Sequence, residues 1–203
     1  MSKFEEVIKM RVALDEAITY GTQLQAQRLT RQALRFVQGQ NMPHEVEYFE
    51  GQLAMLRKNF AAAIEHFDNA IALNPHDGAS YNDRALCMVE QGIIDDALAY
   101  FDRGIEVEPD FATIHHNKGW LLNNIGRYSE AIVCFKKALS LDPLRAVTYD
   151  NLADALFNLS DYRGALRAYK KVITLLGPHR CKSIRRQIIK RIEEIEGVIA
   201  HSP

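Results

Sequence analysis

Hydrophobic and polar positions follow a helical pattern over most of the chain. In residues 113–125 the apolar side chains are spaced for one face of a helix, and Gly126 follows as a stop signal. A second helix is predicted over 129–142, with Ser129 as its N-cap and Pro143 preventing its continuation. The same pattern occurs before and after this pair, and it predicts eight helices over 45–58, 61–74, 79–92, 95–108, 113–126, 129–142, 147–160 and 163–176.

The helix pairs recur with a fixed period. Pro75, Pro109 and Pro143 are 34 residues apart, and each closes an apolar stretch. The same period links a small column (Gly51, Ala85, Gly119, Ala153), an alanine column (Ala63, Ala97, Ala131, Ala165) and an aromatic column (Phe67, Phe101, Phe135, Tyr169). Because one helix pair cannot bury its apolar faces alone, neighbouring pairs must stack. The sequence therefore predicts an all-α solenoid of antiparallel helix pairs.

These columns resemble the tetratricopeptide repeat, which has a small residue in its first helix, an alanine and an aromatic in its second, and a proline in the turn. The segment 126–143, GRYSEAIVCFKKALSLDP, is similar to a consensus second half of that repeat. The resemblance implies a protein-interaction scaffold, adaptor or assembly factor. In this family, a partner segment binds in a concave groove lined mostly by the first helix of each repeat.

The ends of the chain depart from the repeat. Residues 1–43 are predicted to form a degenerate first repeat or a plain helical hairpin, because Gly21, Ala26 and Ala33 keep the intervals of the repeat. A loop of six residues, 39–44, is expected before the four regular units of 44–177. In 178–203, isoleucines at helical spacing (184, 188, 192, 195 and 199) predict a capping helix. The three parts are expected to form one continuous domain.

Composition narrows the class of protein. The chain is 47% hydrophobic and 25% charged, with a net charge of −1, which is typical of a globular protein. No apolar run approaches the roughly 18 residues of a membrane span, and no secretory signal is apparent. The three cysteines are scattered without metal-site spacing, which favours free thiols in a reducing cytoplasm.

No catalytic motif is present, and the chain is expected to be neither an enzyme nor a binder of cofactors or metals. His115 and His116 are adjacent, so on a helix they point about 100° apart and cannot chelate one ion together. His115 shares its column with Tyr81 and Tyr149, which predicts a packing role. Cys87 shares a packing column with Leu121 and Ala155, so we expect an inert, buried thiol.

The resemblance to the family assigns a set of residues to the groove. These are Tyr48, Gln52, Asn82, Asp83, Leu86, Val89, His116, Asn117, Trp120, Asn123, Asn124, Asp150, Asn151, Asp154 and Phe157. Trp120 is assigned to the groove because the core columns are already filled, with interior packing as the alternative. Some members of the family grip a terminal carboxylate with Lys and Arg, but the matching positions here (Tyr48, Gln52, Asp83, Thr113, Asn117) carry no cation. An extended peptide held by asparagines is the remaining expectation.

A basic cluster supplies a second candidate surface. From 162 to 192 there are ten basic residues and no acidic one. The residues assigned to this surface are Arg180, Lys182, Arg185, Arg186, Lys190 and Arg191. Such asymmetry predicts either docking of an acidic or nucleic-acid partner, or simply a solvated helix face. No aromatic residues are interleaved for base stacking, which makes nucleic acid the weaker alternative.

Overall fold

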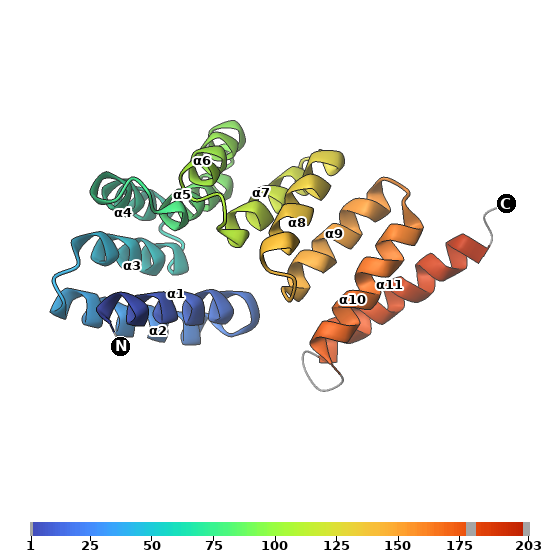
Figure 1. Cartoon of the computed structure of the whole chain (residues 1–203), viewed down its shortest axis with the longest axis horizontal. Helices are drawn as coiled ribbons and strands as arrows, with labels where there is room; N and C mark the ends of the chain where they lie inside the picture. The colour runs from blue at the N-terminus through green and yellow to red at the C-terminus, as the bar shows by residue number, and fades with distance from the viewer. Residues whose placement is uncertain (1, 178–181, 201–203) are drawn as a thin grey trace. The chain divides into compact units, whose positions relative to one another are not determined.

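The computed structural model describes residues 2–177 and 182–200, and within these residues every regular element is an α-helix (Figure 1). The helices are α1 (Lys3–Tyr20), α2 (Gln23–Gly39), α3 (Pro43–Leu56), α4 (Phe60–Leu73), α5 (Gly78–Glu90), α6 (Ile94–Val107), α7 (Ala112–Asn124), α8 (Tyr128–Leu141), α9 (Ala146–Asn158), α10 (Tyr162–Leu176) and α11 (Lys182–Ala200). Helices α3/α4, α5/α6, α7/α8 and α9/α10 pack as hairpins. The prediction of an all-α solenoid of helix pairs is confirmed.

The chain divides into two compact units. The first, unit 1, extends to Pro109, and the second, unit 2, begins at Asp110. Unit 1 therefore holds α1–α6, and unit 2 holds α7–α11.

The helix ends differ slightly from the predicted ones. Each of the eight predicted helices begins one or two residues too late, as at α8, which starts at Tyr128 rather than at 129. The proposed cap at Ser129 is wrong, because Ser129 lies within α8 and the N-cap is Arg127, whose side chain makes no capping hydrogen bond. Side-chain caps occur instead at Asn59 and Asp161, which accept hydrogen bonds from Ala62 N and Gly164 N.

One turn geometry recurs in all four repeats. Lys58, Gly92, Gly126 and Ser160 follow the first helix of each pair, and all four have a positive φ between 60° and 81°. After Gly126, for example, the Arg127 N–H donates to Leu122 O at 2.8 Å and closes the end of α7. The stop signal read at Gly126 is confirmed, and the same left-handed turn is enforced where the residue is Lys or Ser.

Small residues permit the close helix crossings predicted from their column. A Cβ atom built at Gly119 would lie 2.8 Å from the ring of Phe135, and one at Gly51 would lie 2.7 Å from the ring of Phe67. Phe67, Phe101 and Phe135 are fully buried. The aromatic of each second helix therefore fills the space that the small residue of the first helix leaves open.

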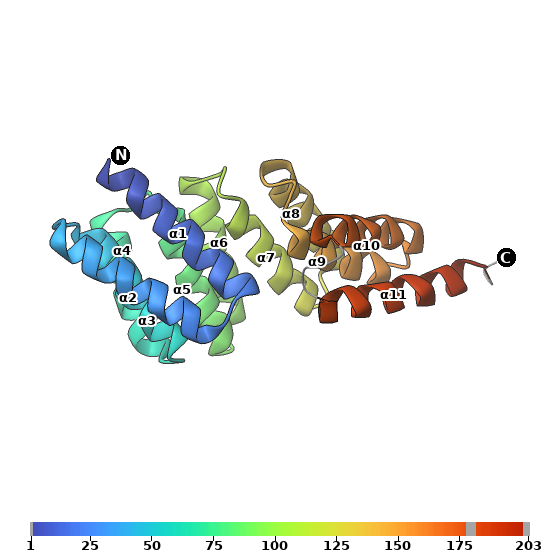
Figure 2. The same ribbon diagram turned by 90° about the horizontal axis from the view of Figure 1, so that it is seen from below.

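The N-terminal hairpin consists of α1 and α2, which lie side by side in both views (Figure 1, Figure 2). Ala26, Thr30 and Ala33 of α2 are buried. Gly21 ends α1 with a φ of −98°, so the hairpin lacks the left-handed turn of the four repeats. The expected loop 39–44 is shorter than predicted, because Gly39 still belongs to α2 and Pro43 opens α3.

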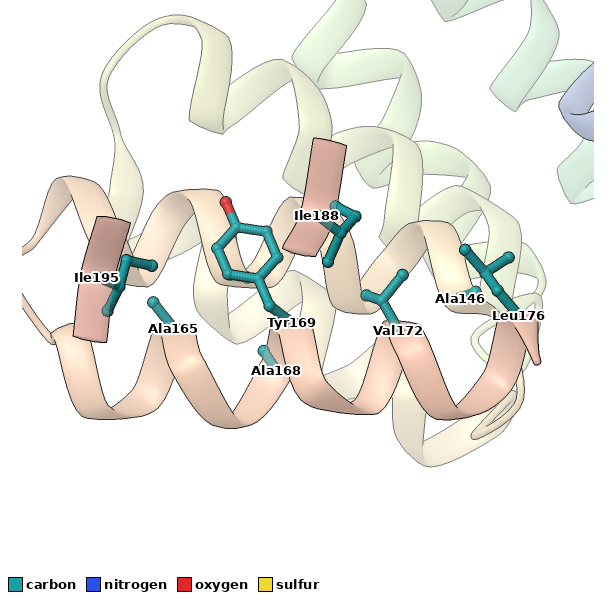
Figure 3. Close-up of a cluster of buried hydrophobic side chains, with 9 residues drawn as sticks. Ala146, Ala165, Ala168, Tyr169, Val172, Leu176, Ile188 and Ile195 are labelled. Carbon is teal, nitrogen blue, oxygen red and sulfur yellow. The ribbon is translucent and has the colours of Figure 1, made fainter. Parts of the chain in front are cut away.

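The C-terminal helix α11 caps α10, as predicted. Ile188 and Ile195 are buried and face the row of Ala165, Tyr169 and Val172 on α10 (Figure 3). Ile192 and Ile199 pack partly against the same cluster, whereas Ile184 is exposed. Burial of this stripe stabilises the end of unit 2, because the apolar face of α10 would otherwise meet solvent.

Candidate functional site

The groove residues predicted in unit 1 are closed off in the structure. Tyr48, Gln52, Asn82 and Asp83 are all buried, and Leu86 and Val89 are half-buried. Gln52 Nε2 and Asn82 Nδ2 both donate to the Asp83 carboxylate, the latter at 2.8 Å. Burial raises the pKa of Asp83 to about 7, despite these hydrogen bonds. Most of these polar groups therefore bond to one another inside unit 1, although the buried Gln52 Oε1 accepts no hydrogen bond.

Arg11 of α1 completes this closure. Its guanidinium lies 3.8 Å from the centre of the Tyr48 ring, and Nη1 donates to Asp77 Oδ1 at 2.7 Å. Arg11 Nε also donates to Glu45 Oε2 at 3.1 Å. Arg11 precedes Tyr48 by 37 residues, the spacing that also separates Ala26 from Ala63. That spacing is the one signal in the sequence that places Arg11 in the column of Tyr48, and it was not among the predicted groove features.

Asp77 is the centre of the unit 1 network. Besides Arg11, it accepts a hydrogen bond from Ser80 Oγ at 2.5 Å, and its Oδ2 lies 3.0 Å from His44 Nε2. Burial alone would raise the pKa of Asp77, but the His44 hydrogen bond and the Arg11 charge hold it well below its ordinary range. Burial disfavours the charged form of His44, yet its hydrogen bonds to Asp77 and Glu45 raise its pKa to about 9.

The predicted groove residues of unit 2 lie on α7 and α9, and several of them are partly or fully exposed. Trp120 and Asn117 of α7 and Asn151 of α9 are half-buried, Asn124 is exposed, and Phe157 is 42% exposed. His116 is buried, with its Nδ1 2.9 Å from Thr148 Oγ1. Burial, with a smaller contribution from the Arg145 charge, lowers the pKa of His116 to about 3, so the ring is neutral. The predicted packing role of His115 is confirmed, since it is also buried.

A pocket of about 430 Å³ lies within unit 2. It is lined by Asn123 of α7, Asp154, Phe157 and Asn158 of α9, Tyr169 of α10, and Arg191, Glu194 and Ile195 of α11. Three of these residues (Asn123, Asp154, Phe157) were assigned to the groove from the sequence, and Arg191 was assigned to the separate basic surface. The structure brings the two predicted surfaces together at this pocket.

Acidic and amide oxygens dominate the polar chemistry of the pocket region. Arg191 Nη1 donates to Asp154 Oδ1 and, at 2.8 Å, to the Tyr169 hydroxyl, which itself donates to Asp154. One turn before Asp154, burial and the charge of Asp154 raise the pKa of Asp150 to about 6. Asp150 Oδ1 and Asn123 Oδ1 are buried and accept no hydrogen bond. Such acceptors favour a ligand that brings N–H donors or positive charge.

Comparison with known proteins identifies the family. Sequence models of the tetratricopeptide repeat match residues 54–119, 112–143 and 145–176. The chain is a tetratricopeptide repeat protein. A search of curated protein sequences gave no match.

Solved structures of other tetratricopeptide repeat proteins share the fold. A thermophilic one from Thermus thermophilus is 17% identical, with a TM-score of 0.69 over 92% of this chain and 96% of that chain. YrrB, described as having an unusual peptide-binding site, is 19% identical, with a TM-score of 0.57 over 82% of this chain and 84% of that chain. The first repeat domain of Spaghetti (RPAP3), bound to the HSP90 peptide SRMEEVD, is 17% identical, with a TM-score of 0.55 over 61% and 94%. These identities support the fold alone.

The basic cluster of this tetratricopeptide repeat protein is partly engaged within unit 2. Arg185 donates to the carbonyl oxygens of Ile173 and Gly177 at 3.2 Å, so it caps the end of α10. Arg191 pairs with Asp154, and Lys190 lies 3.7 Å from Glu194. Lys182 and Arg186 are exposed, and Arg180 lies outside the described residues. The cluster therefore presents fewer available charges than its sequence indicates.

The structure also bears on the cysteine, metal-binding and membrane features considered in the sequence. Cys87 is fully buried, and burial raises the pKa of its thiol to about 12, as expected for an inert packing residue. In the part of the chain that the structure describes, no three His, Cys, Asp or Glu side chains are grouped to hold a metal ion. Over the same residues, no helix combines the length and apolarity needed to cross a bilayer.

Proposed function

We propose that this chain is a non-enzymatic scaffold that binds an extended segment of a partner protein on the α7–α9 face of unit 2. The observation that carries the proposal is the contrast between equivalent positions of the two units. In unit 1, Tyr48 is buried and stacked on Arg11, and Gln52 is buried and bonded to Asp83. In unit 2 the column of Gln52 supplies the half-buried Trp120 and also Asp154, which lines a pocket together with the unpaired acceptor Asn123 Oδ1.

Each part of this face has a role in the proposed complex. Trp120 and Phe157 would provide an apolar floor, since partly exposed aromatic side chains are typical anchors of binding surfaces. Asn124 and Asn151 would hydrogen-bond the backbone of the segment, each contributing about 0.5–1.5 kcal/mol net. Asp150 and Asp154 would favour a segment that carries positive charge. The peptide complexes and peptide-binding site described for other repeat proteins of this fold support this kind of ligand.

The test is a selection from a random peptide library displayed on phage, with the intact chain immobilised. Selected peptides should bind Trp120→Ala at least about thirtyfold more weakly, the loss expected of an aromatic hot spot worth about 2 kcal/mol. Phe4→Ala is the matched control, because Phe4 is an exposed aromatic of α1 far from this face in sequence and belongs to unit 1. Thermal melts of each variant verify that the fold is retained.

Iodide quenching supplies an independent measurement, since Trp120 is the only tryptophan of the chain. Quenching of the native protein should be substantial, and a selected peptide should reduce it. Peptides that bind wild type and Trp120→Ala equally, or a tryptophan emission that iodide cannot quench, would contradict the assignment of the face. A fall in melting temperature of Trp120→Ala without a change in peptide affinity would assign Trp120 to the core instead.

A further inference from the structure

Arg191 holds an unusual position for a residue of a capping helix. Its side chain extends from α11 to α9 and α10, where it binds the Asp154 carboxylate and the Tyr169 hydroxyl. Its guanidinium carbon lies 5.9 Å from the centre of the Tyr169 ring. An aromatic ring beside a carboxylate is a general recognition element for a cationic side chain. Unit 2 thus already contains a site for a cation, and its own terminal helix fills that site.

Unit 1 contains the same arrangement of arginine, tyrosine and carboxylate, but there the arginine is more deeply buried. Arg11 of α1 stacks on Tyr48 and pairs with Asp77, and its side chain is only 19% exposed. The Arg191 side chain is 51% exposed although it makes similar bonds. An ion pair with one partner in solvent contributes little net stability, so it exchanges readily for a competing cation. Arg11 is therefore part of the core of its unit, whereas Arg191 is replaceable.

Three carboxylates lie in or beside the pocket, whereas two cations pair with them, Arg191 with Asp154 and Lys190 with Glu194. Asp154 and Glu194 line the pocket with Arg191, and Asp150 lies one turn before Asp154 on α9. Buried acceptors remain unpaired at Asp150 Oδ1 and Asn123 Oδ1. The walls include the rings of Phe157 and Tyr169 and the side chain of Ile195, which suit the aliphatic stem of a long basic side chain.

We infer that Arg191 is an internal competitor at a subsite for a lysine or arginine side chain of the partner segment, which binds by replacing Arg191 at Asp154 and Tyr169. This inference rests on the proposed function, because the subsite adjoins the α7–α9 face. The partner residue at this subsite is therefore a lysine or an arginine, and Arg191 regulates its access to Asp154 and Tyr169. Removing the competitor should tighten binding, since occupancy of the site by Arg191 reduces the apparent affinity of any other cation.

The experiment uses N-acetyl-arginine amide as the probe, followed by NMR on the intact chain through the side-chain amide of Asn123. Arg191→Gln should bind the probe at least about threefold more tightly than wild type, which corresponds to Arg191 occupying the acceptors about two-thirds of the time. Arg186→Gln is the matched control, because it removes one exposed positive charge from the same helix and should leave the affinity unchanged. N-acetyl-citrulline amide, which has the same shape without the charge, should bind much more weakly.

Two further variants complete the test. Asp154→Asn should abolish probe binding, and Arg191→Lys should retain the competition while preserving the helix. Circular dichroism of each variant shows whether α11 remains folded. Equal affinity of wild type and a folded Arg191→Gln, or equal binding of the citrulline probe, would overturn the inference.

The single-residue probe separates this inference from the proposed function. Trp120→Ala should weaken the selected peptides but leave binding of N-acetyl-arginine amide in the pocket intact. If wild type binds the arginine probe but no peptide, only the proposed peptide-binding face is wrong. If peptides bind but Arg191→Gln does not change the affinity for the probe, only the role of Arg191 as a competitor is wrong.

Discussion

At the scale of single residues, burial distinguishes two of the three carboxylates that the sequence placed in the groove, Asp83 and Asp154. Asp83 is enclosed by Tyr48, Gln52 and Asn82, and it lies near the charges of Asp77 and Arg11. Asp154 instead meets a partly exposed arginine. The first carboxylate is a structural residue of unit 1, and only the second is accessible to a ligand.

The raised pKa of Asp83 gives a testable pH dependence. Its folded-state pKa of about 7 exceeds its ordinary value of 3.8, so the folded state holds this proton more tightly. The stability contributed by the protonated form is complete below about pH 4 and is lost as pH rises to about 7. Wild type should therefore lose unfolding free energy between pH 4 and pH 8. In Asp83→Asn this loss should be smaller than in wild type by at least about 1 kcal/mol.

Urea unfolding at a series of pH values measures this difference. His44 and Asp77 titrate in both proteins, so the comparison isolates the change at Asp83 together with its coupling to the Asp77 charge. Asp95→Asn, at an exposed position of α6, is the control and should leave the pH profile unchanged. If the profile of Asp83→Asn is parallel to that of wild type from pH 4 to pH 8, Asp83 is ionised in the folded state and the proposed burial effect is wrong.

At the scale of helices, the crossing of α7 and α8 depends on small side chains. Ala131 is fully buried, and Gly119 lies against Cys134 and Phe135. Ala131→Leu should therefore lower the unfolding free energy by about 1–3 kcal/mol, because three extra carbon atoms must enter a filled space. Val133→Leu, on the exposed side of α8, should have almost no effect. Chemical denaturation of both variants checks the prediction, and similar values for the two would show that the crossing is loosely packed.

At the scale of the whole molecule, each unit is closed by a terminal helix. Removing residues 178–203 deletes α11 and uncovers Tyr169 and Val172 of α10. The shortened chain should aggregate, or unit 2 should melt at a lower temperature while unit 1 is little affected. Analytical ultracentrifugation with a melting curve tests this. A monomeric truncated chain with unchanged melting would mean that the isoleucine stripe serves another purpose, such as dimerisation.

The sequence by itself determined the helix pairs, their packing columns and their ends to within about two residues. These features are local and periodic, because the small residue and the aromatic residue of one repeat make the same contacts as their equivalents in the next repeat. The turn at Gly126 was predicted from its glycine, and Gly92, one repeat earlier, has the same left-handed geometry in the structure. At Lys58 and Ser160 the residue type gives no such signal, and the packing of the flanking helices imposes the left-handed turn.

Only the tertiary structure decided which groove positions are open. Arg11 and Asp77 are 66 positions apart, and Arg191 and Asp154 are 37 positions apart, so no local pattern predicts either contact. Tyr48 and His116 occupy the same column as Asp150, but each is buried by different neighbours. Exposure and charge at a repeated position depend on long side chains that reach in from terminal helices. The columns of the sequence thus define the scaffold, and these long-range contacts define the surface that a partner can reach.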